Sequence, residues 1–558
     1  MHVVFACFHS HDFVAMSISD ALNLLLYGII DVSSQYPLQA RTMQGIESSC
    51  PLLKKQLPQK YSSCLLLKKQ IKNKYFSCLL FLTATMYTGP VPPTVGSNFR
   101  QSSEKYFANR RKNIVKSIIS AYNKANAKEG EVSRMKNYRK RIADDILMRK
   151  LEGKGAVLIE GPKWCGKTTT AEQLAASILY MDDPEKKAQN ITMSELNPKR
   201  LLKGATPRLI DEWQLAPKLW DAIRFEVDHR GELGQFLLTG SAVPADTKEI
   251  THSGTGRFTW LTMRPMSLYE SGDSTGEVSI KNLFEGNTEI DGGSDLSIDR
   301  LAFLVCRGGW PQAVDMRDEI ALDQATDYYD AVVHSDINRA DNVQKNPEKV
   351  RRLMRSYARN QGGQVPNTVL AQDISVNDEV PISEETVASY VNALRKIFVV
   401  EDMPAWNPNL RSKTAIRSSD TRYYVDPSIA AAALGIGPND LINDLKTFGF
   451  LFETLCIRDL RVFADALNGE VYHYRDKDGQ ECDAVIHLRN GKYGLIEIKL
   501  GGDRLIEEGA KSLKSMAKKI DTDKMNAPIF LMVLTGTGDF AYRRPDGVCV
   551  VPIGCLKN

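Results

Sequence analysis

The sequence predicts an α/β protein whose central element is a parallel β-sheet flanked by helices. Three observations support this fold class. An apolar stretch from Ala156 to Ile159 leads into a glycine-rich loop and then a helical pattern. Apolar strands recur at Arg208–Asp211 and Gln235–Leu238, with a helical pattern at Leu219–Asp228 between them. Strands that alternate with helices form parallel sheets with right-handed crossovers, and ligands bind at the carboxyl edge of such sheets.

The glycine-rich loop has the spacing of a phosphate-binding loop (Walker A), with two glycines five positions apart followed by Lys167 and Thr168. Glycine lets backbone N–H groups turn towards a polyphosphate, because no Cβ stands in the way. Lys167 carries a charge to the β- and γ-phosphates, and the Thr168 hydroxyl is a ligand for Mg²⁺. The helical pattern from Thr169 to Leu179 directs a helix N-terminus at the anion. The predicted ATP contacts are Gly161, Pro162, Lys163, Trp164, Cys165, Gly166, Lys167, Thr168 and Thr169.

The second half of the predicted nucleotide site comes from the strands that follow. The strand at Arg208 ends in Asp211 and Glu212, a Walker B pattern in which Asp211 holds the Mg²⁺ shell and Glu212 polarises the attacking water. The next strand ends in Thr239-Gly240-Ser241, and both Thr239 and Ser241 are candidates to sense the γ-phosphate.

An arginine finger is a further expectation for this site. Arg257 and Arg264 are its candidates, acting in cis or from a neighbouring subunit, and a plain salt bridge is an equally good interpretation of either.

Composition limits the class of protein. The chain has 558 residues, 43% hydrophobic and 25% charged, which suits three or more soluble domains. It lacks the ~18 uninterrupted apolar residues of a membrane span, so we expect no membrane partner. The ten cysteines include no Cys-x-x-Cys pair, which favours a reducing cytoplasm over a disulfide framework or a zinc ribbon.

Residues 1–134 differ in kind from the rest. They hold 17 basic and 7 acidic residues, a net charge of +10, whereas the remainder holds 55 and 61, a net charge of −6. A fourteen-residue repeat begins at Ser48 and again at Ser62, which matches no known solenoid period. We expect this segment to be disordered or a mis-assigned extension, with the true start at Met135.

The middle of the chain predicts two regions beyond a nucleotide core at 135–265. Residues 266–345 predict a helical lid, with a Gly-, Ser- and Asp-rich loop at 272–298 and a helix from Glu319 to Ala340. Residues 346–440 have a winged-helix order of two helices and then two strands. This order suggests DNA binding as a function, although such modules also bind proteins. The sequence does not decide between DNA and protein as the partner, because Glu384, Glu385 and Glu401 weaken the positive field of the nearby basic residues. These basic residues are Lys396, Arg411, Lys413, Arg417 and Arg422.

The C-terminal region, 441–558, predicts a second constellation. Glu453 lies on an amphipathic helix, Asp483 on the second strand of a hairpin, and Glu497 and Lys499 on the next strand. Alternation places Glu497 and Lys499 on one face of that strand. Three carboxylates with a lysine are typical of a metal-dependent nuclease, in which the carboxylates hold Mg²⁺ and the lysine orients water or stabilises the phosphorane. A solvated strand face of opposite charges is the alternative.

From Met135 onward, about three quarters of the chain resembles the predicted AAA-type ATPases of bacteria and archaea, which pair an ATP-binding core with a C-terminal domain of unknown function. The resemblance implies an AAA+ fold, a winged helix and a restriction-endonuclease-like C-terminal fold, without an established biological role. The stretches that carry it are LIEGPKWCGKTT, RLIDEWQ, FLLTGSA, the Gly-Gly-Trp-Pro turn, VEDMPAW, YYVDPS, GFLFETLCIRDLR and LIEIKLG.

These observations favour a Mg²⁺-dependent ATPase that couples its nucleotide state to a DNA- or protein-binding C-terminal half. Two alternatives stay open: an ATP-regulated DNA nuclease, and a nucleotide-switched scaffold without enzymatic output. The sequence leaves the oligomeric state undecided.

Overall fold

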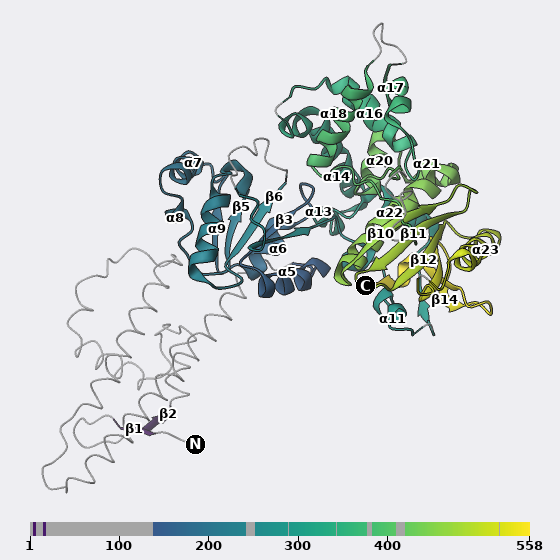
Figure 1. Ribbon diagram of the computed structural model, residues 1–558, viewed down its shortest axis with the longest axis horizontal. Coiled ribbons are helices and arrows are strands. Elements are labelled where there is room, and N and C mark those ends of the chain that lie inside the picture. The colour runs from purple at the N-terminus through teal and green to yellow at the C-terminus, as the bar shows by residue number, and fades with distance from the viewer. Residues whose placement is uncertain are drawn as a thin grey trace, which may run out of the picture. The chain divides into compact units, whose positions relative to one another are not determined.

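A computed structural model describes residues 4–6, 15–17 and 138–558, apart from 242–251, 288, 342, 376–381, 409–418 and 524. The chain divides into two compact units, Met1–Asn123 and Lys124–Asn558. In the first unit, β1 (Val4–Ala6) pairs antiparallel with β2 (Ala15–Ser17) (Figure 1). The remainder of the predicted extension, 1–134, lies outside the described residues.

The predicted parallel sheet is present, and it has five strands (Figure 1). The strand that leads into the glycine-rich loop lies second from one edge, so its loop opens between neighbours on both sides. In spatial order the strands are β4 (Ser177–Tyr180), β5 (Arg208–Asp211), β6 (Phe236–Gly240), β3 (Ala156–Glu160) and β7 (Phe258–Thr262).

Helices cover both faces of this sheet, because its strands are apolar at successive positions. Val157 and Ile159 of β3 pack in the same core cluster as α5 (Ile142–Gly153) and α6 (Lys167–Leu174). Ala156 and Leu158 point the other way, towards α9 (Leu219–Arg230). Alternation along one strand therefore fills two cores at once.

One element prediction in this core was wrong. The helix expected from Thr169 to Leu179 ends at Leu174, and Ser177–Tyr180 forms the edge strand β4, because pairing with β5 replaces the helical pattern. The stretch that follows forms two helices, α7 (Lys187–Leu196) and α8 (Pro198–Leu201). Pro198 causes the break, since the residue before a proline is disfavoured in a helix.

The middle region is helical. The predicted helix Glu319–Ala340 is present as α14 (Asp318–Ala331), a π-helical turn η3 (Val332–Asp336) and α15 (Ile337–Arg339). The other helices here are α10 (Leu268–Ser271), α11 (Ile280–Phe284), α12 (Ile298–Arg307), α13 (Pro311–Val314), α16 (Pro347–Arg359), α17 (Asn367–Ser375), α18 (Glu384–Lys396), α20 (Pro427–Leu434) and α21 (Pro438–Asn443).

The loop predicted at 272–298 is instead structured. It contains β8 (Val278–Ser279), α11 and β9 (Gly292–Gly293). β8 pairs with β16 (Leu556–Lys557), and β9 pairs with β14 (Phe540–Arg543). β9 thus joins the seven-stranded C-terminal sheet, whereas β8 and β16 form a two-stranded sheet of their own. The partners of this segment lie too far along the chain for local composition to reveal them.

The winged-helix order is only partly reproduced. After α18, two extended segments meet through isolated antiparallel bridges, Val400 to Tyr424 and Met403 to Thr421, rather than through a continuous ladder. Arg411, Lys413 and Arg417 lie outside the described residues. Arg422 is not a surface cation, because its guanidinium donates to Val365 O and Asn367 Oδ1 and pairs with Asp402.

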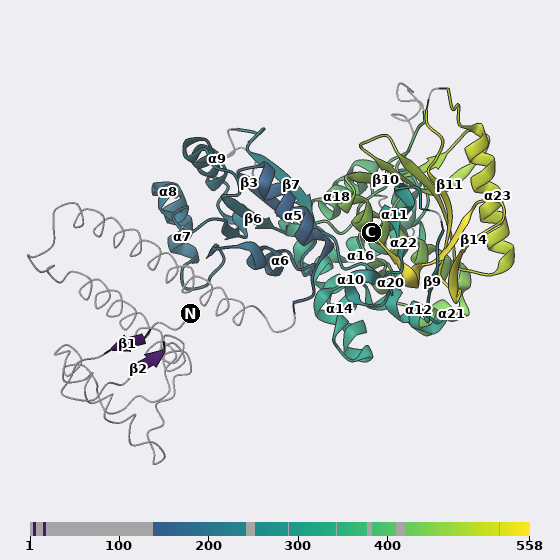
Figure 2. The same ribbon diagram turned by 90° about the horizontal axis from the view of Figure 1, so that it is seen from below.

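The C-terminal part is a seven-stranded sheet with a helix on each face (Figure 2). On one face α22 (Leu445–Ala466) packs against Ala484 and Ile486, and on the other α23 (Asp503–Lys519) packs against Val485 and Leu495. The strand order is β10 (Gly469–Arg475), β11 (Glu481–Leu488), β12 (Tyr493–Lys499), β13 (Phe530–Thr535), β15 (Cys549–Pro552), β14 and β9. None of the helices within the described ranges is long and apolar enough to cross a membrane.

Helix α22 carries buried charges that fasten it to the middle region. Arg458 is 2% exposed and pairs with Asp426 at 2.9 Å and with Asp459 at 2.7 Å. Asp426 also accepts hydrogen bonds from Gly309 N and from the backbone and hydroxyl of Ser428. A buried guanidinium tolerates burial only when its charge is balanced, so these carboxylates hold Arg458 in place.

Replacing Asp426 with Ala should therefore destabilise the protein strongly. The change leaves Arg458 with half its counter-charge and Gly309 N without an acceptor, for a cost of about 3–5 kcal/mol. Asp145→Ala is the matched control, since its pair with Lys140 is 60% and 71% exposed and worth under about 1 kcal/mol. Urea unfolding measures both, and equal midpoints for the two variants would contradict the role of Asp426.

Candidate functional site

The glycine-rich loop lies between β3 and α6 with its lysine folded inward. Lys167 is 6% exposed, and its ammonium donates to Gly161 O at 2.9 Å and Pro162 O at 2.6 Å. No carboxylate lies within ion-pair distance of Lys167 in the described part of the chain, although its charge reaches Glu212 and lowers the pKa of that residue against the larger effect of burial. Gly161 has φ 149° and lies where a Cβ would come 2.0 Å from Met263 O. Only glycine fits there, as the loop pattern requires.

Asp211 and two hydroxyls meet at the carboxyl edge of the sheet. Register brings Asp211 level with Thr239, because Ile210 lies opposite Leu238. Asp211 Oδ1 accepts hydrogen bonds from Thr168 Oγ1 at 2.7 Å and from Thr239 Oγ1. Hydroxyl and carboxylate oxygens are the donors that Mg²⁺ prefers, so this group fits the ion expected with a nucleotide. Of the two sensor candidates, Thr239 makes this contact, and no such contact occurs for Ser241 among the described residues.

Glu212 occupies an unusual backbone position beside this group. Its φ is 53°, in the left-handed region that non-glycine residues seldom adopt, and such positions cluster at functional sites. Burial and the charge of Asp211 raise the pKa of Glu212. Gln214 Nε2 donates to its carboxylate and fixes its direction.

The two arginine-finger candidates are placed elsewhere. Arg257 precedes β7, and its carbonyl accepts from Ala156 N at the amino end of β3, whereas the glycine-rich loop follows the carboxyl end. Its guanidinium pairs with Asp228 at 2.7 Å. A role for Arg257 at the nucleotide of its own chain is therefore not supported.

Arg264 is at the correct edge but is already engaged. It makes two hydrogen bonds to Glu401, at 2.6 and 2.8 Å, and one to Asp465 at 2.5 Å. Its side chain is 10% exposed. Burial alone would raise the pKa of Glu401, but Arg264 and Arg461 hold that pKa down at about 2. Arg264 is thus a structural ion-pair residue in this conformation.

The tip of the loop contacts the helical middle region. Lys163 Nζ lies 2.6 Å from Asp336 Oδ1 in the π-helical turn η3. The Trp164 ring lies 5.9 Å from that of Tyr328 on α14, which in turn lies 4.4 Å from the Trp310 ring. A change in the loop therefore reaches η3 and α14 directly.

The C-terminal constellation also assembles. Lys499 Nζ donates to Glu497 Oε2 at 2.6 Å and to Asp483 Oδ2 at 3.0 Å. Burial and the charge of Asp483 raise the pKa of Glu453 to about 8 and that of Glu497 to about 7. Tyr423 OH donates to Glu453 from the middle region. The four predicted residues thus interact, with Glu453 entering from α22 on the other face of the sheet.

A β-bulge turns Asp483 towards this cluster. One residue of β10, His473, lies opposite two residues of β11, Asp483 and Ala484, because the register shifts between Tyr472 and Tyr474. Bulges re-aim side chains in this way next to functional sites. Asp483 Oδ2 then also accepts from Ile498 N at 2.7 Å. The hairpin was predictable from the sequence, but the bulge was not.

The predicted metal site is not formed in this arrangement. Over the described ranges, no group of three or more His, Cys, Asp or Glu side chains is placed to hold a metal ion. Instead, the ammonium of Lys499 lies between Asp483 and Glu497 and neutralises them. The cluster as it stands therefore fits an internal ion-pair network rather than a metal centre.

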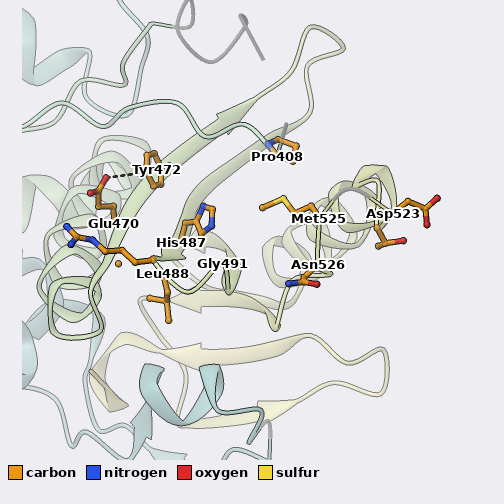
Figure 3. A pocket seen from close by; sticks show the side chains of 12 residues that line it. Pro408, Glu470, Tyr472, His487, Leu488, Gly491, Asp523, Met525 and Asn526 are labelled. Atoms are coloured by element: carbon orange, nitrogen blue, oxygen red, sulfur yellow. Dashed lines mark hydrogen bonds between the residues drawn. The ribbon is translucent and has the colours of Figure 1, made fainter. Parts of the chain in front are cut away.

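A separate cavity of about 610 Å³ lies at the edge of the C-terminal sheet (Figure 3). Tyr472 and His487 line it from β10 and β11, and Met525 and Asn526 line it from the opposite side. Trp406 Nε1 donates to His487 Nδ1 at 3.1 Å. None of the predicted catalytic or binding residues lines this cavity, so it is distinct from both sites above.

Comparison with known families shows which kind of domain contains the first site. Residues 153–271 match the family described as the AAA domain. This part of the chain is an AAA domain. Residues 298–440 match a domain of unknown function (DUF8612), and residues 448–556 match another (DUF4143). The resemblance to AAA-type ATPases with a C-terminal domain of unknown function is confirmed.

Relatives extend the likeness but add no activity. An uncharacterized protein of Mycobacterium tuberculosis and one of Mycobacterium bovis are each 22% identical over 424 residues, covering 74% of this chain and 83% of theirs. The Walker-type ATPase PABY2304 of Pyrococcus abyssi covers 54% of this chain and 97% of its own, with 12% identity and a TM-score of 0.33. A signal transduction ATPase with numerous domains and a tetratricopeptide repeat sensor, from Pyrococcus horikoshii, has 12% identity, covers 60% of this chain and 50% of its own, and has a TM-score of 0.19.

Sequence reasoning missed several residues around the AAA domain. Arg141 donates to Cys165 O of the loop and pairs with Glu270, and Asp336 pairs with Lys163 of the loop. Arg141 precedes α5 in a basic stretch, which is typical of an ordinary helix start. Asp336 follows the polar residues His334 and Ser335 on its turn, so its charge did not stand out in the sequence.

Replacing Asp336 with Asn should tighten nucleotide binding. Asp336 competes with phosphate for Lys163 and repels anions. The pair is only partly exposed, with the Lys163 side chain at 39% and that of Asp336 at 10%. Because an exposed pair is worth about 0.2–1 kcal/mol, affinity should rise at least roughly 1.5- to 5-fold. Added salt should shrink the difference, because screening weakens both effects. Asp330→Asn, on α14 and 3.9 Å from Arg351, is the control. Titration of a fluorescent ADP analogue measures the change, and weaker binding by Asp336→Asn would refute this role.

Proposed function

We propose that the protein binds ATP with Mg²⁺, hydrolyses it, and couples its nucleotide state to the helical and C-terminal regions. The observation that carries the proposal is the buried ammonium of Lys167, the first residue of α6, which donates to two carbonyls of the loop and makes no ion pair among the described residues. A buried cation held only by carbonyl groups is favourable where an anion binds. The N-terminus of α6 adds its dipole to the same point.

The residues of the site divide the chemistry among them. Lys167 exchanges its bonds to Gly161 O and Pro162 O for phosphate oxygens, which stabilises the charge that develops on the transferred group. Thr168 and Asp211 would hold Mg²⁺, which would screen the phosphate charges. Glu212 accepts a hydrogen bond from the attacking water, and its raised pKa brings it closer to the pKa range of an effective base. Thr239 stands beside Asp211, where a γ-phosphate sensor is needed.

Coupling follows from the contacts of the loop. A nucleotide that draws Lys163 away from Asp336 releases η3, and a shift of Trp164 moves the ring contact with Tyr328. A ligand changes a conformation only through differential contacts with its two states, and these are such contacts. The output in the coupled half is DNA or protein binding. A scaffold that only switches partners is the alternative, and salt-dependent retention of DNA would count against it.

Substitutions at Lys167 and Glu212 separate binding from hydrolysis. Lys167→Ala should abolish detectable ATP binding, because it removes the buried ammonium that would bind the phosphates. Glu212→Gln should keep ATP binding and lower turnover by about 10²–10⁴-fold, the range for loss of a general base. Binding is measured by titration with a fluorescent ATP analogue and turnover by phosphate release.

The control for these two variants is Glu195→Gln, which alters an exposed carboxylate of α7 paired with Lys218 at 3.7 Å. Turnover of Glu212→Gln at the wild-type rate would show that another group polarises the water. Wild-type ATP affinity in Lys167→Ala would overturn the assignment of the loop.

A second candidate function is cleavage of DNA by the C-terminal cluster. The observation that favours it is the convergence of Asp483, Glu497 and Lys499 at a bulge, with the pKa of Glu497 raised to about 7 by burial and Asp483. Lys499 could stabilise a phosphorane. Among the described residues, the carboxylates as placed do not form a metal centre.

Cleavage assays with linear and branched DNA in Mg²⁺ or Mn²⁺ test this function. Wild-type protein should nick the DNA, and Asp483→Ala should lose the activity, because Lys499 and Ile498 N then lack their shared acceptor. Asp478→Ala in the exposed turn of the same hairpin is the control. Cleavage that survives Asp483→Ala would exclude this site, and absence of cleavage by the wild type would leave the ATPase proposal standing alone.

A further inference from the structure

Arg141 lies outside the matched AAA domain yet contacts its phosphate loop. It precedes α5, and its side chain is 3% exposed. The guanidinium donates in three directions, from Nε to Glu270 Oε1 at 3.0 Å, from Nη1 to Cys165 O at 2.8 Å and from Nη2 to Arg264 O at 2.9 Å. Each acceptor belongs to a different segment of the chain, so Arg141 joins the loop to the strand and helix beside it.

The bond to Cys165 O sets the direction of one peptide group in the loop. In a trans peptide the C=O and the following N–H point in opposite directions. Because the Cys165 carbonyl is held towards Arg141, the N–H of Gly166 is turned away from it. Gly166 has φ 97° and caps the start of α6, where the loop pattern directs its N–H groups at phosphate.

The remaining contacts fix Arg141 itself. Glu270 balances its charge, and this carboxylate also accepts from Ile142 N at 2.8 Å and from Ser267 N at 2.9 Å. Arg264 O belongs to the segment that follows β7, whose Met263 O accepts from Cys165 Sγ at 3.4 Å. The loop is therefore held against a wall that is anchored independently of any ligand.

We propose that Arg141 is a positioning residue for nucleotide binding, which orients the Cys165–Gly166 peptide without touching the nucleotide. The inference rests on the proposed function, since it requires that the loop bind a polyphosphate. A guanidinium suits this task because its planar fork donates to several acceptors at once, whereas a lysine ammonium on a flexible stem does not reproduce that geometry.

Arg141→Lys tests the proposal while keeping the charge opposite Glu270. Loss of a charged hydrogen bond that orders the loop should weaken binding of a fluorescent ADP analogue by about 10-fold or more. KM for ATP should rise in step, while kcat at saturation changes by less than about 3-fold, because Glu212 and Asp211 are untouched. Arg139→Lys is the matched control, two residues away and paired at the surface with Asp315.

A second variant guards against a folding artefact. Arg141→Met combined with Glu270→Gln removes both buried charges together, so neither is left uncompensated. It should show the same loss of affinity, with the thermal unfolding midpoint recorded in parallel. Affinity that falls only in proportion to the folded fraction would overturn the proposal, because a purely structural role predicts that pattern.

The outcomes distinguish this inference from the proposed function. Wild-type protein that binds nucleotide, with Arg141→Lys binding equally well, overturns the role of Arg141 alone. Wild-type protein that binds no ADP or ATP analogue overturns the proposed function and the inference with it. A rise in KM with kcat preserved, absent in Arg139→Lys, supports the positioning role.

Discussion

The close approach of Met263 O to Gly161 is the constraint on which the arrangement of the site depends. A Cβ at Gly161 would lie 2.0 Å from that oxygen, so the phosphate loop and the segment after β7 fit together only with glycine there. That segment is held in turn by the rest of the unit, since Arg264 pairs with Glu401 and Asp465. The nucleotide loop is therefore built against charges that come from the middle and C-terminal regions.

Helix α22 connects the two candidate sites physically. Asp465 near its C-terminus contacts Arg264 beside the AAA domain, and Glu453 in its first half approaches Asp483. Twelve residues of helix separate these two positions, which is about 18 Å at the usual rise per residue. A displacement of α22 as one rigid body would therefore move both ends together. This geometry supplies a route for coupling, and its energetic weight is a matter for mutant cycles.

Local patterns predicted which residues come together at the proposed nucleotide site. The loop, the strand ending in Asp211 and the strand ending in Thr239 each carry their signal within a few residues, and the parallel sheet brings their carboxyl ends together. The position of Arg257 could also have been predicted from the sequence, because a residue that precedes a parallel strand lies at the amino edge of the sheet. The contact of Arg264 with Glu401 was not, since it depends on packing between regions far apart in sequence.

Errors arose where long-range pairing overrides local pattern. Ser177–Tyr180 continues a helical pattern but becomes a strand because β5 offers backbone partners. Asp483 was predicted on the correct strand, yet its direction depends on a bulge that no residue type announces. The three carboxylates of the predicted metal site are not gathered as a metal-holding group for a different reason, because Lys499 pairs with Asp483 and Glu497. Burial and competition among charges, rather than spacing, decided that outcome.

The pairing of β9 with β14 has a consequence for how the chain is made. Gly293 leaves the ribosome long before its partner Phe540 has been synthesised, and the same holds for Val278 and its partner Leu556. The strands β8 and β9 therefore cannot pair while the regions between them and their partners are being made. The edge of the C-terminal sheet is covered by β9 only after β14 has been synthesised. The region 448–556, although matched as a domain by itself, cannot be excised without opening the edge that β9 covers. An exposed strand edge is a template for aggregation, so we expect this region to aggregate more readily when it is expressed without the segment that carries β9.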